Sequence, residues 1–237
     1  PYSVLTSEQL RKEFGQATFF TATDGNHGRG VAWAANHLGQ KAVVHMPKGT
    51  TQTRLQNIAK EGSQVDIQEL NYDDCVRLAA KEADETPRGV IVQDTAWDGY
   101  EEIPAWIMQG YSTMAMEAGE QLKAQGCERP THIFVQAGVG SLAGAVVGYF
   151  SNLYADNLPT FVVVEAEAAA CLYKGAAAGE SGAAPFGALA AMMTMDEYKD
   201  LRNDIGLDEN SKVLLFSTEG DTDPDRYKNI VWKGLDK

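Results

Sequence analysis

The sequence of 237 residues has few cysteines and no long apolar run. Its three cysteines, Cys75, Cys127 and Cys171, are odd in number and have no CxxC spacing, which argues against a disulfide framework or a structural zinc site. We therefore expect a reducing, cytoplasmic environment and no metal ion. The longest apolar stretches, such as Phe161–Val164, are far too short to span a bilayer, so we expect no membrane insertion.

Positive charge is also scarce, because 20 lysines and arginines stand against 33 aspartates and glutamates and leave a net charge of −13. A nucleic-acid partner would require a basic surface, so this balance argues against one. The chain begins with Pro1 and has no basic flank followed by an apolar run. We therefore expect no secretory signal, and we expect the chain to begin part-way through a longer protein.

The sequence does contain a regular alternation of apolar strands and amphipathic helices. Strands that are apolar throughout and separated by helices predict parallel sheets covered on both faces. We therefore predict an α/β protein with doubly wound parallel sheets in two domains, a smaller one over 22–98 and a larger one formed by 1–21 and 99–237. The predicted strands cover residues 17–21, 41–46, 64–69, 89–94, 132–136, 161–165 and 212–216.

One stretch interrupts this alternation. Residues 174–189 are rich in alanine and glycine where another strand and helix are expected. We interpret the stretch as a loop or, preferably, as a seam near residue 180 at which residues are missing.

Three glycine-containing loops follow predicted strands, at the end of a parallel sheet where ligands bind. The first, TATDGNHGRG (21–30), combines glycines that permit close backbone approach with the free N–H groups of a helix start, which favours a carboxylate. The second, QAGVGSLAG (136–144), has the strand, glycine and helix order suited to a phosphate. The third, FSTEGDTD (216–223), brings the hydroxyls of Ser217 and Thr218 to a strand end.

The second loop by itself also fits a dinucleotide-binding fingerprint. Gly138, Gly140 and Ala143 have the required spacing, and Glu165 ends the next strand, where an acid would bind the ribose. An NAD-dependent oxidoreductase is therefore the alternative from another enzyme class. That alternative leaves the first and third loops without a role, and each of those alone could be an ordinary polar turn before a helix.

Seven motifs recur together in one known family, and they are spread over the chain: TDGNHGRGVAWAA, MPKG, NYDD, IVQDTAWDGY, IPAWIMQGY, QAGVG and STEGDTD. As a set they resemble the diaminopropionate ammonia-lyases, which belong to the fold-type II pyridoxal-phosphate enzymes together with tryptophan synthase β and the serine and threonine dehydratases. The resemblance implies a tryptophan synthase β-like fold, pyridoxal phosphate as cofactor and a homodimer. It also implies α,β-elimination of a small amino acid, 2,3-diaminopropionate, to pyruvate and ammonia.

The resemblance further assigns the first loop to the substrate. Thr23, Gly25 and His27 would bind the substrate, and Asp24 would be the base that deprotonates one of its two enantiomers. Asp94, at the end of the strand GVIVQD, would face the side-chain amine of the substrate.

The cofactor would be held by residues from all three loops. Asn26 would contact its O3′ atom. Ser217 or Thr218 would face its ring nitrogen, and Ser217 is favoured by analogy with related loops. The residues expected to bind its phosphate are Gly138, Val139, Gly140 and Ser141.

The family's Schiff-base lysine precedes the first loop, where this chain has only Lys12, in a polar segment without a matching motif. A Schiff base needs a desolvated amine at the cofactor aldehyde, and Lys12 stands in a charged segment. We therefore expect no covalent cofactor anchor in this chain. A catalytically degenerate homologue that still binds a ligand is the non-enzymatic alternative.

Overall fold

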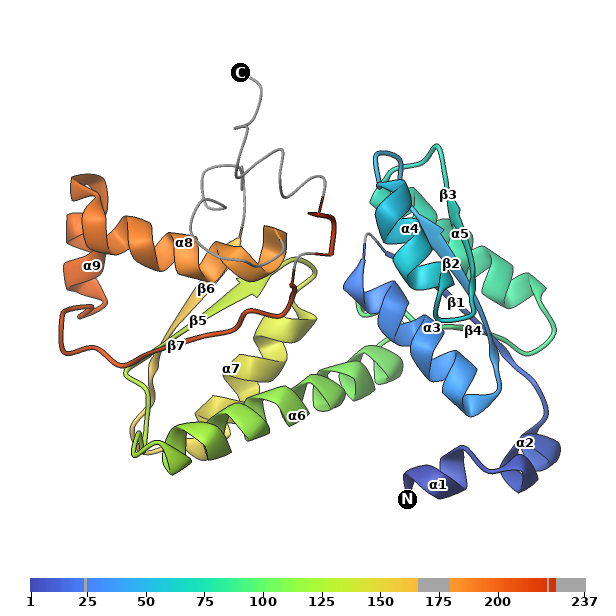
Figure 1. Cartoon of the computed structure of the whole chain (residues 1–237), viewed down its shortest axis with the longest axis horizontal. Coiled ribbons are helices and arrows are strands. Elements are labelled where there is room, and N and C mark those ends of the chain that lie inside the picture. The colour runs from blue at the N-terminus through green and yellow to red at the C-terminus, as the bar shows by residue number, and fades with distance from the viewer. Residues whose placement is uncertain (24, 166–179, 221, 225–237) are drawn as a thin grey trace. The chain divides into compact units, whose positions relative to one another are not determined.

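The computed structural model describes residues 1–23, 25–165, 180–220 and 222–224 of the chain. The chain divides into two compact units, Pro1–Ile103 and Pro104–Lys237, and each has a parallel sheet of its own (Figure 1). The prediction of an α/β protein with parallel sheets in two parts is therefore confirmed.

The first unit contains a four-stranded sheet in the order β3-β2-β1-β4, in which all neighbours are parallel. Its strands are β1 (Thr18–Ala22), β2 (Lys41–Met46), β3 (Gln64–Ile67) and β4 (Gly89–Ile91). Its helices are α1 (Tyr2–Leu5), α2 (Glu8–Phe14), α3 (Asn26–Leu38), α4 (Gln52–Ala59) and α5 (Tyr72–Glu85). The loops that follow β1 and β4 consequently leave the same edge of the sheet from adjacent strands.

Both faces of this sheet are covered by helices. Consecutive residues of a strand point to opposite faces, and Val43 and Val44 of β2 do so. Val44 belongs to a core that includes residues of α3 and α4, whereas Val43 lies with Phe20 against α5. The sheet is therefore doubly wound, as apolar strands without polar alternation predict.

The second unit contains a three-stranded parallel sheet in the order β6-β5-β7. Its strands are β5 (His132–Ala137), β6 (Thr160–Glu165) and β7 (Val213–Leu215). Its helices are α6 (Glu102–Ala124), α7 (Ser141–Leu153), α8 (Glu180–Thr194) and α9 (Lys199–Asp204), with the 3-10 helix η3 (Asp196–Tyr198) before α9. Ile133 and Val135 of β5 are fully buried against α6 and α7, while α8 packs on β5 and β6 on the opposite side of the sheet (Figure 1).

The observed division of the chain differs from the expected one at residues 1–21 and 99–103. These residues were assigned to the larger domain, but they belong to the first unit. The physical reason is the sheet itself, because β1 is hydrogen-bonded to β2 on one side and to β4 on the other.

The expectation of a loop is also corrected for residues 180–189, because they form the first part of α8. Alanine favours helix, and Ala183 and Ala184 are almost completely buried. Gly182 lies so close to the backbone of Glu219 that an added Cβ would be 3.0 Å from its carbonyl oxygen. The small residues therefore serve close packing of a helix. Residues 174–179 lie outside the described part of the chain.

Candidate active site

The loop after β1 is built around the side chain of Thr23, which is 3% exposed. Its hydroxyl oxygen accepts hydrogen bonds from the backbone N–H groups of Gly25 (3.0 Å) and Gly28 (3.1 Å). An added Cβ at Gly28 would be 2.2 Å from the Cγ2 atom of Thr23, so no larger residue fits there without movement. This packing fixes the path of the chain from the central strand into α3.

The first turn of α3 is open to a ligand. Helices α2, α4 and α5 are preceded by the capping residues Ser7, Thr51 and Asn71, whose side chains accept hydrogen bonds from backbone N–H groups of the helix. Helix α3 instead follows Gly25, which has no side chain to offer, and its first residue, Asn26, is exposed. Such a helix start leaves N–H groups available to an anion, as the sequence predicted for a carboxylate.

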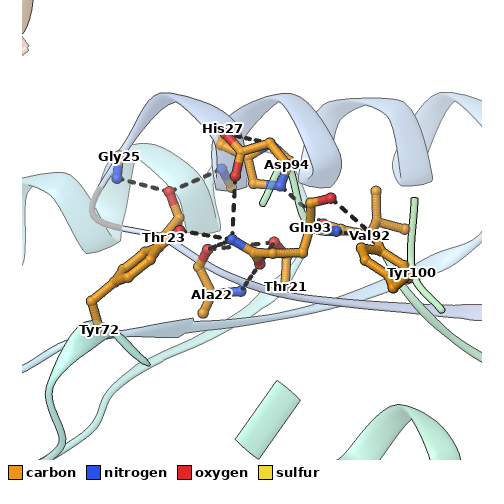
Figure 2. A network of polar contacts seen from close by, with 11 residues as sticks. Thr21, Ala22, Thr23, Gly25, His27, Tyr72, Val92, Gln93, Asp94 and Tyr100 are labelled. Atoms are coloured by element: carbon orange, nitrogen blue, oxygen red, sulfur yellow. Dashed lines mark hydrogen bonds and ion pairs between the residues drawn. The ribbon is translucent and has the colours of Figure 1, made fainter. Parts of the chain in front are cut away.

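The strand expected over 89–94 ends at Ile91. Beyond that point the side chain of Gln93 makes the hydrogen bonds to β1 that backbone groups of a longer strand would make (Figure 2). Gln93 is completely buried. Its Oε1 atom accepts from the Thr21 hydroxyl (2.9 Å) and the Ala22 N–H (3.0 Å), and its Nε2 donates to the Ala22 carbonyl (3.1 Å). The same amide nitrogen also donates to the Tyr72 hydroxyl (2.8 Å).

Asp94 lies next to this carboxamide. Its Oδ1 atom is 3.3 Å from Gln93 Nε2, and its Oδ2 atom is 3.9 Å from Nδ1 of His27. The Nε2 atom of His27 is 2.9 Å from the carbonyl oxygen of Val92, which can only accept, so this nitrogen carries a proton. The side chains of His27 and Asp94 are each 13% exposed. Two residues from separate predicted motifs therefore meet at one edge of the sheet.

Tyr100 secures the backbone at the same place. Its hydroxyl accepts from the Gln93 N–H (2.7 Å) and lies 3.1 Å from the carbonyl oxygens of Ile91 and Gln93. Burial is the main cause that raises the pKa of Tyr100, against a lowering by the Gln93 N–H, and the charge of Asp94 raises it further. The hydroxyl therefore stays protonated and donates to a carbonyl. The ring of Trp97 stacks on Tyr100 with centroids 4.2 Å apart.

The second unit carries the loop that was predicted to bind phosphate. Gly138, Val139 and Gly140 are exposed directly after β5, and α7 begins at Ser141, which is buried. Gly140 has φ 96°, a left-handed conformation that favours glycine, and it offers no side chain to cap the helix. No atom lies within 4 Å of a Cβ built at Gly138 or Gly140. The loop thus leaves open space in front of the start of α7.

The third loop lies beside this one, because β7 pairs with β5. Gln136, at the end of β5, is 7% exposed, and its Nε2 donates to the Thr218 hydroxyl oxygen at 2.6 Å. Its Oε1 atom is buried and has no hydrogen-bond partner within the described part of the chain. Ser217 and Thr218 are both exposed. Since Thr218 accepts from Gln136, its own proton is left to be donated elsewhere.

These features fit the cofactor that the sequence implied. Pyridoxal phosphate carries a dianionic phosphate, which suits the open glycine loop and the start of α7. The ring nitrogen of the cofactor can accept a hydrogen bond from a neutral hydroxyl, such as that of Thr218 in the neighbouring loop. No cluster of histidine, cysteine and acidic side chains suited to a metal ion occurs among the described residues.

A comparison with protein families decides between pyridoxal phosphate and a dinucleotide as the cofactor. A model for "Pyridoxal-phosphate dependent enzyme" matches residues 2–210. The chain belongs to this family. The predicted family and its cofactor are thereby confirmed, and the dinucleotide alternative, which used Glu165 at the exposed end of β6, finds no support.

Individual relatives show which members of the family this chain resembles. The diaminopropionate ammonia-lyase of Salmonella typhimurium is 41% identical over 300 residues, which cover 98% of this chain and 74% of the relative. The Escherichia coli enzyme in complex with D-serine matches with a TM-score of 0.84 and 37% identity, over 92% of this chain and 70% of the other. Its complex with an aminoacrylate-PLP azomethine reaction intermediate matches with a TM-score of 0.85 and 34% identity, over 98% and 79%.

The match with the Salmonella protein is longer than this chain, 300 residues against 237, so the relative has additional residues inside the matched region. The expectation that such residues are missing near position 180 stays a prediction. So does the absence of a lysine anchor. The described helices include none that is long and apolar enough to cross a membrane.

The predicted site residues are divided between the two units. Thr23, Gly25, Asn26, His27 and Asp94 belong to the first unit, and all are described. The second unit holds Gly138, Val139, Gly140, Ser141, Ser217 and Thr218. Asp24 lies outside the described residues. All the other predicted site residues are described by the structure.

Sequence reasoning missed the polar residues that support the site. These are Gln93, Tyr72, Tyr100 and Gln136. The signal available for two of them was a glutamine at the end of an otherwise apolar strand, in GVIVQD and HIFVQ. A buried amide needs partners for both its oxygen and its nitrogen, so a glutamine at that position indicates a polar network.

Proposed function

We propose that this chain is the catalytic core of a lyase that eliminates ammonia from 2,3-diaminopropionate, with pyridoxal phosphate as cofactor and with pyruvate and ammonia as products. The observation that carries the proposal is the glycine loop before α7, because it leaves open space in front of a helix start, which suits a phosphate. Similarity to the diaminopropionate ammonia-lyases of two bacteria supports the choice of substrate.

We assign the cofactor to the residues that the sequence indicated. The N–H groups of Gly138–Ser141 and the Ser141 hydroxyl bind the phosphate, and a hydroxyl of Ser217 or Thr218 donates to the ring nitrogen. Asn26, exposed at the start of α3, contacts the O3′ atom. When bound, pyridoxal phosphate supplies an electron sink for the carbon whose proton is removed.

The first unit binds and orients the substrate in this proposal. The carboxylate of the substrate accepts hydrogen bonds from N–H groups at the start of α3, where Thr23 holds Gly25 and Gly28 in place. Asp94 faces the side-chain amine, whose positive charge a carboxylate attracts. Asp24 takes the proton from Cα of one enantiomer.

The proposal is tested first by cofactor binding. Gly140→Asp would place a carboxylate beside the phosphate and a side chain on a left-handed residue, so we expect retention of pyridoxal phosphate in equilibrium dialysis to be abolished. The matched control is Gly148→Asp, because Gly148 is exposed on the same helix and nothing lies within 4 Å of its Cβ position. Equal retention by the two variants would contradict the phosphate site.

A turnover assay distinguishes an active enzyme from a catalytically degenerate homologue. We expect the protein with pyridoxal phosphate to form pyruvate from 2,3-diaminopropionate, whereas a degenerate homologue would form none. Reduction with borohydride, followed by mass spectrometry of this chain alone, should label none of its lysines. A labelled lysine would show that the anchor lies in this chain.

We further propose a homodimer and a cytoplasmic location, as the resemblance and the cysteine usage suggest. Sedimentation of the cofactor-loaded protein at micromolar concentration measures the first of these. A monomer at that concentration would contradict it.

A further inference from the structure

Gln93 has no part in the proposed reaction, yet it completes the sheet at the site. The parallel register of β1 and β4 pairs Thr18 with Gly89 and Phe20 with Ile91, and the Val92 N–H extends it by donating to the Phe20 carbonyl at 2.8 Å. Ala22 is the next residue of β1 whose backbone N–H and carbonyl face this side of the sheet. Both backbone groups of Ala22 bond to the side-chain carboxamide of Gln93 instead of to backbone.

Because the side chain of Gln93 makes these hydrogen bonds, its backbone can turn away from the sheet. The Tyr100 hydroxyl takes up the freed N–H at 2.7 Å, and the loop between them folds back so that Trp97 and Tyr100 form an isolated antiparallel bridge. Gly99 has φ 85°, which permits that turn. As a result, Asp94 leaves the strand end with its side chain beside His27 (Figure 2).

The carboxylate of Asp94 lies between Gln93 and His27. The Nε2 atom of Gln93 lies 3.3 Å from Oδ1, and Nδ1 of His27 lies 3.9 Å from Oδ2. Gln93 is fully buried and bonded to β1, so its amide nitrogen is a donor in a constant position. His27 is held in turn by the Val92 carbonyl.

We propose that Gln93, supported by Tyr100, is a positioning residue that holds the Asp94 carboxylate in place for the side-chain ammonium of the substrate. The proposal rests on the proposed function, in which Asp94 faces that amine. It predicts a specificity effect. A contact between opposite charges depends strongly on the placement of the carboxylate, whereas the hydroxyl of serine brings no charge to the same position.

The test compares two ligands that share the carboxylate and the α-amine and differ in the side chain. 2,3-Diaminopropionate carries an amine there, and D-serine carries a hydroxyl. Affinities are measured by calorimetry on the full-length protein loaded with pyridoxal phosphate. We expect Gln93→Leu to weaken 2,3-diaminopropionate about ten-fold more than D-serine, the loss of roughly one hydrogen bond to a charged group.

Gln93→Leu leaves several buried polar groups without partners, and the variant could fail to fold. Tyr100→Phe is therefore the second variant, because it removes one hydroxyl that holds the Gln93 backbone and keeps the carboxamide. Its matched control is Tyr149→Phe, which removes a tyrosine hydroxyl from α7 in the second unit and leaves every contact of Gln93 in place. We expect a selective loss with Tyr100→Phe, and with Tyr149→Phe no selective loss.

A spectroscopic readout tests the same idea without ligand or cofactor. The 13C carboxyl signal of Asp94, assigned with Asp94→Asn, should move in Tyr100→Phe and stay in place in Tyr149→Phe. Equal losses of both ligands, or an Asp94 signal that does not respond to Tyr100→Phe, would overturn the inference and leave the proposed function standing. If the wild type binds neither ligand, the proposed function fails, and the Asp94 signal alone then decides the inference.

Discussion

Two glycines on α3, two residues apart, should respond to the same substitution with opposite sign. Gly30 is exposed and has nothing within 4 Å of its Cβ position, whereas a Cβ at Gly28 would lie 2.2 Å from Cγ2 of Thr23 and 2.9 Å from Cγ1 of Val44. Alanine favours helix over glycine by roughly 0.5–1 kcal/mol. That gain acts alone at Gly30, so Gly30→Ala should raise the free energy of unfolding by about that amount.

At Gly28 the steric cost is larger than this gain. Overpacking of a filled interior costs typically ~1–3 kcal/mol. Relief by rotation of Thr23 would break the bonds from its hydroxyl to Gly25 and Gly28, and each such bond is worth about 0.5–1.5 kcal/mol. We therefore expect Gly28→Ala to lower the free energy of unfolding by roughly 1–3 kcal/mol.

The closest clash can be removed separately. Thr23→Ser deletes the Cγ2 atom and retains the hydroxyl, so Gly28→Ala should cost less in that background than in the wild type. Urea unfolding of the four proteins forms a double-mutant cycle, in which contacting residues show coupling of about 0.5–3 kcal/mol. Additive effects, or a Gly28→Ala variant as stable as Gly30→Ala, would refute the steric argument.

Two further predictions concern the cofactor and the substrate. Thr218 accepts from Gln136 and has a proton to donate, so Thr218→Val should change the absorption spectrum of bound pyridoxal phosphate more than Ser217→Ala does; the reverse order would favour Ser217 at the ring nitrogen. Asp24→Asn in the full-length enzyme should slow the elimination of one enantiomer of 2,3-diaminopropionate by about a hundred-fold or more, because it removes a positioned base, and it should spare the other enantiomer. Equal losses in pyruvate formation from the two enantiomers would limit Asp24 to binding.

The fold class followed from the sequence because its signal is local. The apolar strand 41–46 was predicted with the bounds that the structure has, and its residues are buried against helices on both faces. Hydrophobic periodicity carries this information within a few residues. The glycine loops were found for the same reason, because a strand, a glycine turn and a helix start follow one another along the chain.

Features that depend on long-range hydrogen bonds and packing could be seen only in the tertiary structure. The strand toward Asp94 stops at Ile91 because Gln93 and Tyr100, seven residues apart, take over the hydrogen bonds of the ladder. Residues 180–189 suggest a loop by their glycines, but they form a helix in which Gly182 lies close to the backbone of Glu219. Residues 1–21 join the first unit because β1 lies between β2 and β4. In each case the deciding partner is distant along the chain or on another strand, where composition and periodicity carry no signal.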